Sequence, residues 1–240
     1  MNYVISDIHG CYKEFKTLLK NIGFSSADTL FVLGDMVDRG PDPIGVLRLM
    51  ASYPNIYPLA GNHEFIMMSI LQKLMQEISE DNIESTLTEE FLHKYNLWIE
   101  DGGATTINGF KKLPKEEQEF LLDYLNDLSV YERITVNNQN YILVHSLPDN
   151  LQNGNDLNYQ IEEIIFGRPD FTASWNQEDI YIIGHTPTFK IPGAESGKIY
   201  RRNNLIDIDC GCVTGHALCA YCIDTCLLYT SPSPRDRQKS

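Results

Sequence analysis

Five short apolar runs in this chain are each followed at once by acidic, amide or imidazole side chains. The runs have the length of buried strands, and helical patterns separate the first of them. Ligand sites of open α/β sheets lie beyond the carboxyl ends of the strands, so these polar side chains are expected to converge at one edge. They are Asp7 and His9 in SDIHG, Asp35 in GDMVDRG, Asn62 and His63 in GNHE, His145 in LVHS and His185 in GHT.

The periodicity predicts an α/β fold in which two sheets form a β-sandwich flanked by helices. The first part of the chain has a βαβαβ order. The second part is β-rich and includes the apparent hairpin around NNQ. Strands are expected at 2–6, 29–33, 55–59, 130–136, 140–145, 180–183, 205–209 and 217–223, with helices at 11–22, 42–52 and 158–165.

A largely helical insertion is predicted between the two halves, over residues 64–127. Helical patterns cover 64–80, 85–100 and 113–127, and a glycine-broken connection, DGGATTINGF, precedes the last of them. Because long insertions commonly carry function, this one is expected to cover the site.

The domain is predicted to span residues 1–225 and to exclude the tail, 226–240. In the tail, CLLYTSPSPRDRQKS, Ser, Pro and Arg crowd together and the hydrophobic pattern stops. The string resembles an in-frame translation of a sequencing adapter, which predicts an artefactual, disordered segment. A short disordered natural tail is the alternative.

Composition and charge bear on which classes of partner and which location are expected for the chain. A formal net charge of −14 over 240 residues argues against attraction to nucleic acid or to an anionic membrane surface. The apolar runs are too short to cross a bilayer and the N-terminus lacks a signal peptide, so a cytoplasmic location is expected. The six cysteines are then expected to be reduced thiols, with a zinc site at residues 210–222 as the alternative.

The polar strand ends have a specific chemistry when they are taken together. Singly, Asp7 and Asp35 read as helix caps, Asn62 as a turn residue and the histidines as core residues. Mixed Asp, His and Asn ligands without a thiolate suit manganese, iron or zinc. Two such ions, bridged by one carboxylate, would generate a hydroxide nucleophile and hydrolyse a phosphate ester directly.

The motifs D-x-H-G, G-D-x-V-D-R-G and G-N-H-E, in this order, resemble the metal-dependent phosphoprotein phosphatases among the calcineurin-like metallophosphoesterases. The resemblance covers about residues 1–225, and the compact bacterial and phage serine/threonine phosphatases look most similar. It implies hydrolysis of phosphoserine and phosphothreonine in phosphorylated protein substrates, and it leaves phosphotyrosine open.

The resemblance also implies a role for each motif residue. Asp35 would bridge two divalent ions, Mn²⁺ being expected and iron or zinc remaining alternatives. His63 would be the general acid and Asp38 the carboxylate that orients it. The implied ligands are Asp7, His9 and Asp35 for one ion and Asp35, Asn62, His145 and His185 for the other, and the implied substrate contacts are Arg39, Arg168 and Asn62.

Two alternatives remain beside the phosphatase. Symmetrical dinucleoside tetraphosphate hydrolases share these motifs, but typically have V-A-R where this chain has Val37-Asp38-Arg39 and Asp where it has Glu64, so both positions favour the phosphatase. A non-catalytic binding module is opposed by the presence of all six ligands. Ala60 replaces an arginine of many relatives, so one phosphate contact of the family is absent.

Overall fold

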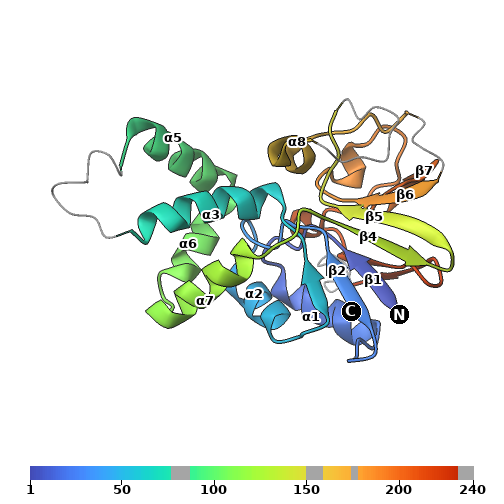
Figure 1. Cartoon of the computed structure of the whole chain (residues 1–240), viewed down its shortest axis with the longest axis horizontal. Helices are drawn as coiled ribbons and strands as arrows, with labels where there is room; N and C mark the ends of the chain where they lie inside the picture. The colour runs from blue at the N-terminus through green and yellow to red at the C-terminus, as the bar shows by residue number, and fades with distance from the viewer. Residues whose placement is uncertain (77–86, 150–158, 174–177, 232–240) are drawn as a thin grey trace.

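The structure is a computed structural model that describes residues 1–76, 87–149, 159–173 and 178–231. Within these residues two five-stranded sheets pack face to face, and helices cover their outer faces (Figure 1). The predicted two-sheet sandwich is therefore confirmed. Parts of the predicted helices at 64–80, 85–100 and 158–165, and the tail from 232 onward, lie outside the described residues.

The first sheet has the strand order β10-β9-β1-β2-β3. Its three parallel strands run in the same direction toward the site, and the two last strands of the chain extend it in antiparallel fashion. The strands are β1 (Asn2–Ile5), β2 (Thr29–Val32), β3 (Ile56–Pro58), β9 (Cys219–Cys222) and β10 (Leu227–Thr230), and the helices between them are α1 (Tyr12–Asn21) and α2 (Pro43–Ala51).

The second sheet has the order β4-β5-β6-β8-β7 and begins with the predicted hairpin. Asn137 and Asn138, both with positive φ, make its two-residue turn, which suits the twist of the flanking strands. The short edge strand β7 had no clear sequence pattern and was not predicted. The strands are β4 (Tyr131–Val136), β5 (Gln139–Val144), β6 (Asp179–Ile183), β7 (Tyr200–Arg202) and β8 (Leu205–Asp207).

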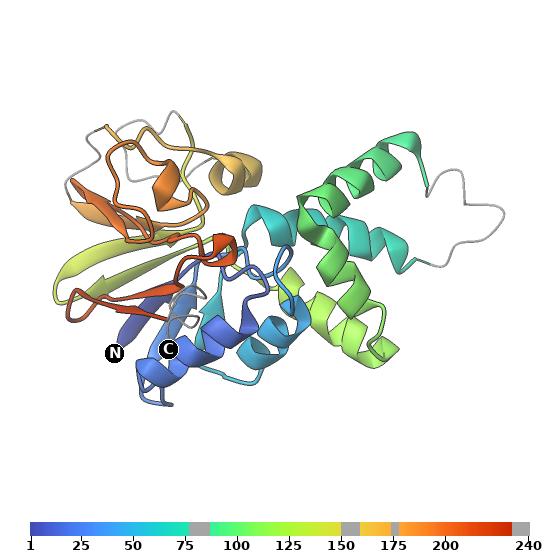
Figure 2. The ribbon, with the colours of Figure 1, turned by 180° about the vertical axis from the view of Figure 1, so that it is seen from behind.

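The insertion projects from one side of the sandwich as a group of helices (Figure 2). In the predicted connection DGGATTINGF, Gly102 at φ 107° breaks the helical conformation in a kink, and the helix α6 begins directly after it. The helices described in the insertion are α3 (Asn62–Leu74), α5 (Glu89–Trp98), the turn η1 (Ile99–Gly103), α6 (Ala104–Phe110) and α7 (Lys115–Asn126). Later in the chain follow the helix α8 (Ile161–Phe166) and the 3-10 turns η2 (Thr188–Lys190) and η3 (Cys212–Thr214).

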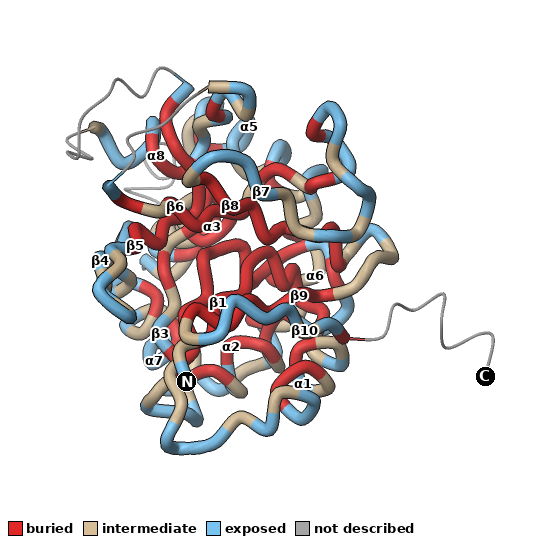
Figure 3. Tube along the Cα trace, turned by 90° about the vertical axis from the view of Figure 1, so that its right-hand side faces the viewer, coloured by how far each residue is buried: buried red, intermediate tan, exposed pale blue. Residues whose placement is uncertain are grey.

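Alternation along the strands divides the core into layers. In β1, Val4 faces the second sheet, where it belongs to the same cluster as Leu143 and Ile206, while Ile5 packs with Leu18 of α1. The buried trace therefore runs through the centre of both sheets (Figure 3). This packing holds the strand ends rigidly at the edge where the polar residues follow.

The tail differs in part from the expectation of disorder. Residues 227–230 form β10, in which Leu228 pairs with Tyr221 of β9. The LLYT run still has strand-forming residues, so it adds to the open edge of the first sheet. The division of the chain at residue 225 stays a prediction.

Candidate active site at the strand ends

The predicted polar residues meet at one edge of the two sheets. Asp7 follows β1, Asp35 follows β2, and Asn62 begins α3 directly after β3. His145 and His185 follow β5 and β6 of the other sheet. All of them are buried except His185, which is half-buried.

Backbone conformation at this edge is unusual. Left-handed φ angles are costly for residues other than glycine and concentrate at functional sites. Gly34 at φ 76° avoids that cost, and a Cβ there would lie 2.6 Å from the Cα of Gly61. Six residues singled out from the sequence have positive φ: Asp7, His9, Asp35, Asp38, Arg39 and His185.

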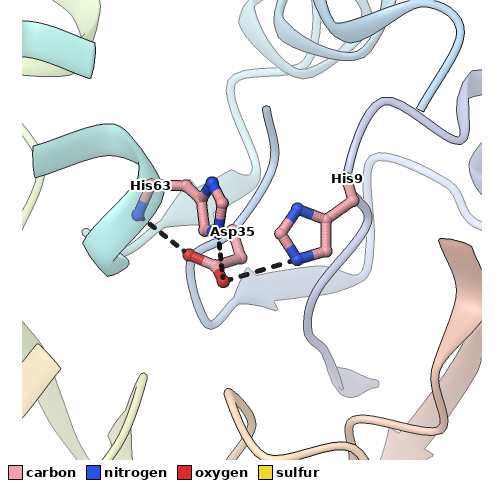
Figure 4. A group of neighbouring side chains, drawn as sticks. All are labelled: His9, Asp35 and His63. Atoms are coloured by element: carbon pink, nitrogen blue, oxygen red, sulfur yellow. Dashed lines mark hydrogen bonds and ion pairs between the residues drawn. The ribbon is translucent and has the colours of Figure 1, made fainter. Parts of the chain in front are cut away.

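Asp35 lies at the centre of the site, between imidazoles from both sheets. Its Oδ2 is 3.5 Å from His9 Nε2 and 3.9 Å from His63 Nε2 (Figure 4). Its Oδ1 is 3.4 Å from His145 Nε2. Burial alone would raise the pKa of Asp35, but the histidines outweigh it and hold the pKa below its usual range.

The histidines present lone pairs to this carboxylate. The Nδ1–H of His145 donates to the Leu33 carbonyl at 2.7 Å, which leaves its Nε2 as an acceptor. The Nδ1 of His9 is held in the same way by the Val37 carbonyl at 2.9 Å. Burial lowers the pKa of His9 to about 4 and that of His185 to about 3, so both are neutral.

Acceptor atoms therefore face one another without a proton between them. His145 Nε2 is 3.1 Å from Asn62 Oδ1 and 3.4 Å from Asp35 Oδ1. In addition, the Nε2 atom of the neutral His185 is buried without a partner. Buried acceptors that converge in this way need a cation, and their N and O chemistry fits a divalent transition metal.

Two groups of possible metal ligands share Asp35. One consists of His9, Asp35 and His63, and the other of Asp35, His145 and His185, with the ligand atoms of each group within 4.8 Å of one another. Asp7 belongs to neither group among the described residues. Its carboxylate accepts from the His185 backbone N–H at 3.0 Å and from the Ser6 hydroxyl. The assignment of Asp7 to one ion stays a prediction.

His63, a member of the first group, also forms a buried pair with Asp38. The Nδ1–H of His63 donates to Asp38 Oδ2 at 2.7 Å. Burial opposes the charged imidazole, but the carboxylates of Asp35 and Asp38 outweigh it and raise the pKa of His63 to about 9. His63 is therefore protonated at neutral pH, with Nε2 directed at the Asp35 carboxylate.

The insertion supplies residues that the sequence analysis missed. Trp98 Nε1 donates to Asp38 Oδ2 at 2.8 Å, and Thr106 Oγ1 donates to Asp38 Oδ1 at 2.5 Å. Asp101, which is exposed, lies with Oδ2 3.4 Å from His63 Nε2. The glycine pair at Gly102 and Gly103 was the only signal, and it was interpreted as a break. The insertion thus completes the surroundings of the histidine.

The two predicted phosphate arginines lie at the same edge. Arg39 donates to His9 Nε2 at 2.8 Å and to Asp101 Oδ1 at 2.9 Å. Arg168, which follows α8, donates to Thr186 Oγ1 at 2.9 Å and so lies next to His185. Both guanidinium groups flank the histidines, from opposite sheets.

Glu64 joins the loop after β2 to the start of α3. Its buried carboxylate accepts backbone N–H groups of Asp35 and Gly61 at Oε2, at 2.8 and 3.0 Å. Its Oε1 accepts those of Met36 and Val37, at 2.8 and 3.2 Å. Four donors on one carboxylate fix the position of Asp35 relative to Asn62.

Glu64→Gln is expected to destabilise the fold by about 2 to 4 kcal/mol, because the amide nitrogen leaves two buried N–H donors without an acceptor. Urea unfolding measures this loss. Glu163→Gln is the matched control, since Glu163 accepts one exposed backbone N–H in α8, at 2.9 Å, and should cost less than about 1 kcal/mol. Equal stability of the two variants would contradict the role of Glu64.

The cysteines do not form the alternative zinc site. All six are free, and five of them are buried. Within the described part of the chain, no group of metal-competent side chains includes a cysteine. No helix among the described residues is long and apolar enough to cross a membrane.

Two curated relatives of the chain carry the same enzyme name. A symmetrical bis(5'-nucleosyl)-tetraphosphatase of Wigglesworthia glossinidia brevipalpis is 35% identical over 114 residues, 47% of this chain and 42% of the relative. The enzyme of the same name from Buchnera aphidicola is 40% identical over 113 residues, 46% of this chain and 41% of the relative. The chain thus spans less than half the length of these relatives.

A solved structure of a candidate diadenosine tetraphosphatase has the same fold. Its TM-score is 0.66 at 20% identity, and the match covers 97% of this chain and 93% of that one. Identity this low shows the fold alone.

The expected protein phosphatase and its phosphorylated protein partners are wrong. The relatives named above are tetraphosphatases instead. The prediction failed because it took Asp38 and Glu64 as marks of the substrate. In the structure both are buried and hold other protein groups, so neither reaches a leaving group.

The sequence profile of the calcineurin-like phosphoesterases matches residues 3–218. That range contains both sheets' strand ends and every residue of the site described above. The narrower bacterial and phage type is not confirmed. This chain belongs to the calcineurin-like phosphoesterase family.

Proposed function

We propose that this chain is a symmetrical dinucleoside tetraphosphatase, which adds water to the central P–O–P linkage and releases two nucleoside diphosphates. The proposal is carried by one observation: two ligand groups share Asp35, and His63 lies between the carboxylates of Asp35 and Asp38. The names of the curated relatives supply the substrate class. A cytoplasmic location is proposed with it, supported by the six free cysteines.

The site residues are proposed to divide into ligands and phosphate contacts. Asp7, His9, Asp35, Asn62, His145 and His185 are proposed as ligands of two divalent ions, with Mn²⁺ the first to test. Such ions supply Lewis acidity toward a phosphate and lower the pKa of water. Arg39 and Arg168 would hold the anionic phosphates from two sides through their planar guanidinium groups.

His63 is proposed to donate a proton to the bridging oxygen as the P–O bond breaks. Its pKa of about 9 keeps it in the acid form at neutral pH. Asp38 accepts from Nδ1 and so fixes Nε2 as the atom that carries the mobile proton. Trp98 and Thr106 hold Asp38 in turn, which restricts the imidazole to one orientation.

Product analysis tests the proposal directly. Diadenosine tetraphosphate incubated with the protein and Mn²⁺ is expected to give ADP alone, and an excess of chelator is expected to stop the reaction. Parallel reactions with iron or zinc identify the preferred ion. ATP and AMP in equal amounts would show asymmetrical cleavage, and the absence of any product would contradict the proposal.

A further inference from the structure

A cavity of about 350 Å³ lies beside the site, between α3, α8 and the segment after α7. Its wall from α3 includes Phe65, Met68 and Gln72, and Asn126 and Leu128 line the opposite wall. Among these the apolar side chains dominate, and a few amides interrupt them. A volume of this size with such a lining is typical of small-molecule sites.

The cavity adjoins the proposed ligands through the first turn of α3. Glu64 lines it, and the same carboxylate accepts the backbone N–H of Asp35 at 2.8 Å. The helix α8 lies beside this end of α3, in contact with it (Figure 1). A ligand with its phosphate near Asp35 could therefore extend across the turn into the cavity.

The aromatic border of the cavity is the ring of Phe65, which packs against Phe166 of α8, a residue that lines a neighbouring cavity. Phe65 and Phe166 are packed edge to face, with ring centroids 6.4 Å apart. Phe166 is 40% exposed, and Gly167 and Arg168 follow it. The aromatic border thus packs against the short segment that carries a proposed phosphate arginine.

The lining has no cationic side chain, so the cavity is unsuited to phosphate. Its one carboxylate, Glu64, already accepts four backbone N–H groups. Ala60 lies at the wall where many relatives have an arginine, which leaves that position small and uncharged. The occupant should therefore be a neutral, largely apolar group attached to a phosphate.

We infer that this cavity binds a nucleobase of the substrate, an inference that rests on the proposed function. A base can stack on the aromatic border, and stacking of this kind tolerates any base. The side-chain amides of Gln72 and Asn126 can each donate to and accept from the edge of a base. The scissile phosphates would then lie at the Asp35 groups, outside the cavity.

The test compares AMP with ribose 5-phosphate, which lacks only the base. The wild-type protein is expected to bind AMP about tenfold more tightly in calorimetric titrations, the size of one stacking contact. Ser69→Trp, which fills the cavity from α3, should remove this preference. It should also lower kcat/KM for diadenosine tetraphosphate about tenfold relative to kcat/KM for p-nitrophenyl phosphate.

A matched variant controls for the added tryptophan. Lys111 lines a separate cavity of about 260 Å³ between α3, α5 and α6. Lys111→Trp should therefore change neither the preference for AMP over ribose 5-phosphate nor the ratio of the two kcat/KM values. Should Ser69→Trp fail to fold, Phe65→Ala removes the stacking ring and makes the same prediction.

The outcomes separate the two proposals. If AMP and ribose 5-phosphate bind equally to the wild type, or if Ser69→Trp keeps the preference for AMP, the nucleobase cavity is wrong even when ADP is produced. If the preference exists and disappears in Ser69→Trp but diadenosine tetraphosphate is not cleaved, the cavity is supported and the proposed reaction is wrong.

Discussion

His63→Asn is expected to lower kcat for diadenosine tetraphosphate by about 10²- to 10⁴-fold, the range that a general acid contributes. Asparagine keeps a polar group of similar size but cannot hand a proton to the leaving oxygen. The substitution removes one donor from Asp38 Oδ2, but Trp98 Nε1 still donates to the same oxygen. Single-turnover rates with metal content measured in parallel separate chemistry from metal loss.

The role of His63 as a general acid predicts how the rate loss in His63→Asn depends on the leaving group and how the wild-type rate depends on pH. A more basic leaving oxygen needs the proton more, so the loss should be larger for phenyl phosphate than for p-nitrophenyl phosphate. The wild-type rate should fall at alkaline pH as His63, with a pKa raised to about 9, loses its proton. Asp38→Asn removes a charge that raises this pKa, so the fall should move to lower pH.

Two results would contradict the assignment. Unchanged turnover of His63→Asn with normal metal content would show that the proton comes from elsewhere. An equal loss on both aryl phosphates would show that His63 acts in binding or in holding the site rather than in proton transfer.

Asp35→Asn is expected to reduce bound divalent metal from about two ions per chain to less than one and to lower activity more than about 100-fold. The reason is that Asp35 is common to both ligand groups. In such sites, loss of a group that only holds a ligand in place already lowers metal affinity or activity about 10- to 100-fold. Loss of the shared carboxylate should therefore lower both by more.

Metal analysis and thermal unfolding test this without reference to activity. Added Mn²⁺ should raise the melting temperature of the wild type, because an ion that binds only the folded state stabilises it. The same ion should leave the melting temperature of Asp35→Asn unchanged. Asp42→Asn is the control, since Asp42 caps α2 at an exposed position and should retain the metal response. Full metal content in Asp35→Asn would overturn the shared-ligand proposal.

The convergence of the site was predictable from the sequence because it depends on local patterns. Each strand ends where an apolar run ends, and the polar residue that follows is then placed by the sheet. Asp7 and Asp35 illustrate this, since they follow β1 and β2, which pair in parallel. Parallel strands carry such residues to one edge whatever their distance in sequence.

The support of the site was not predictable in this way. Trp98 and Thr106 reach Asp38 from helices of the insertion, and only tertiary packing brings them there. Asp101 reaches His63 from the kink at Gly102 between two helices of the insertion. Substrate choice was misjudged for a related reason, because Asp38 and Glu64 face inward.

The bonds of Glu64 have a consequence for how the protein acquires its ions. Four backbone N–H groups bonded to Glu64 hold the spacing of Asp35 and Asn62, so protein bonds fix the positions of these two proposed ligands. Selectivity should follow the size of the ion against a fixed set of atoms, and the supply of each ion in the cell should decide which one is found there.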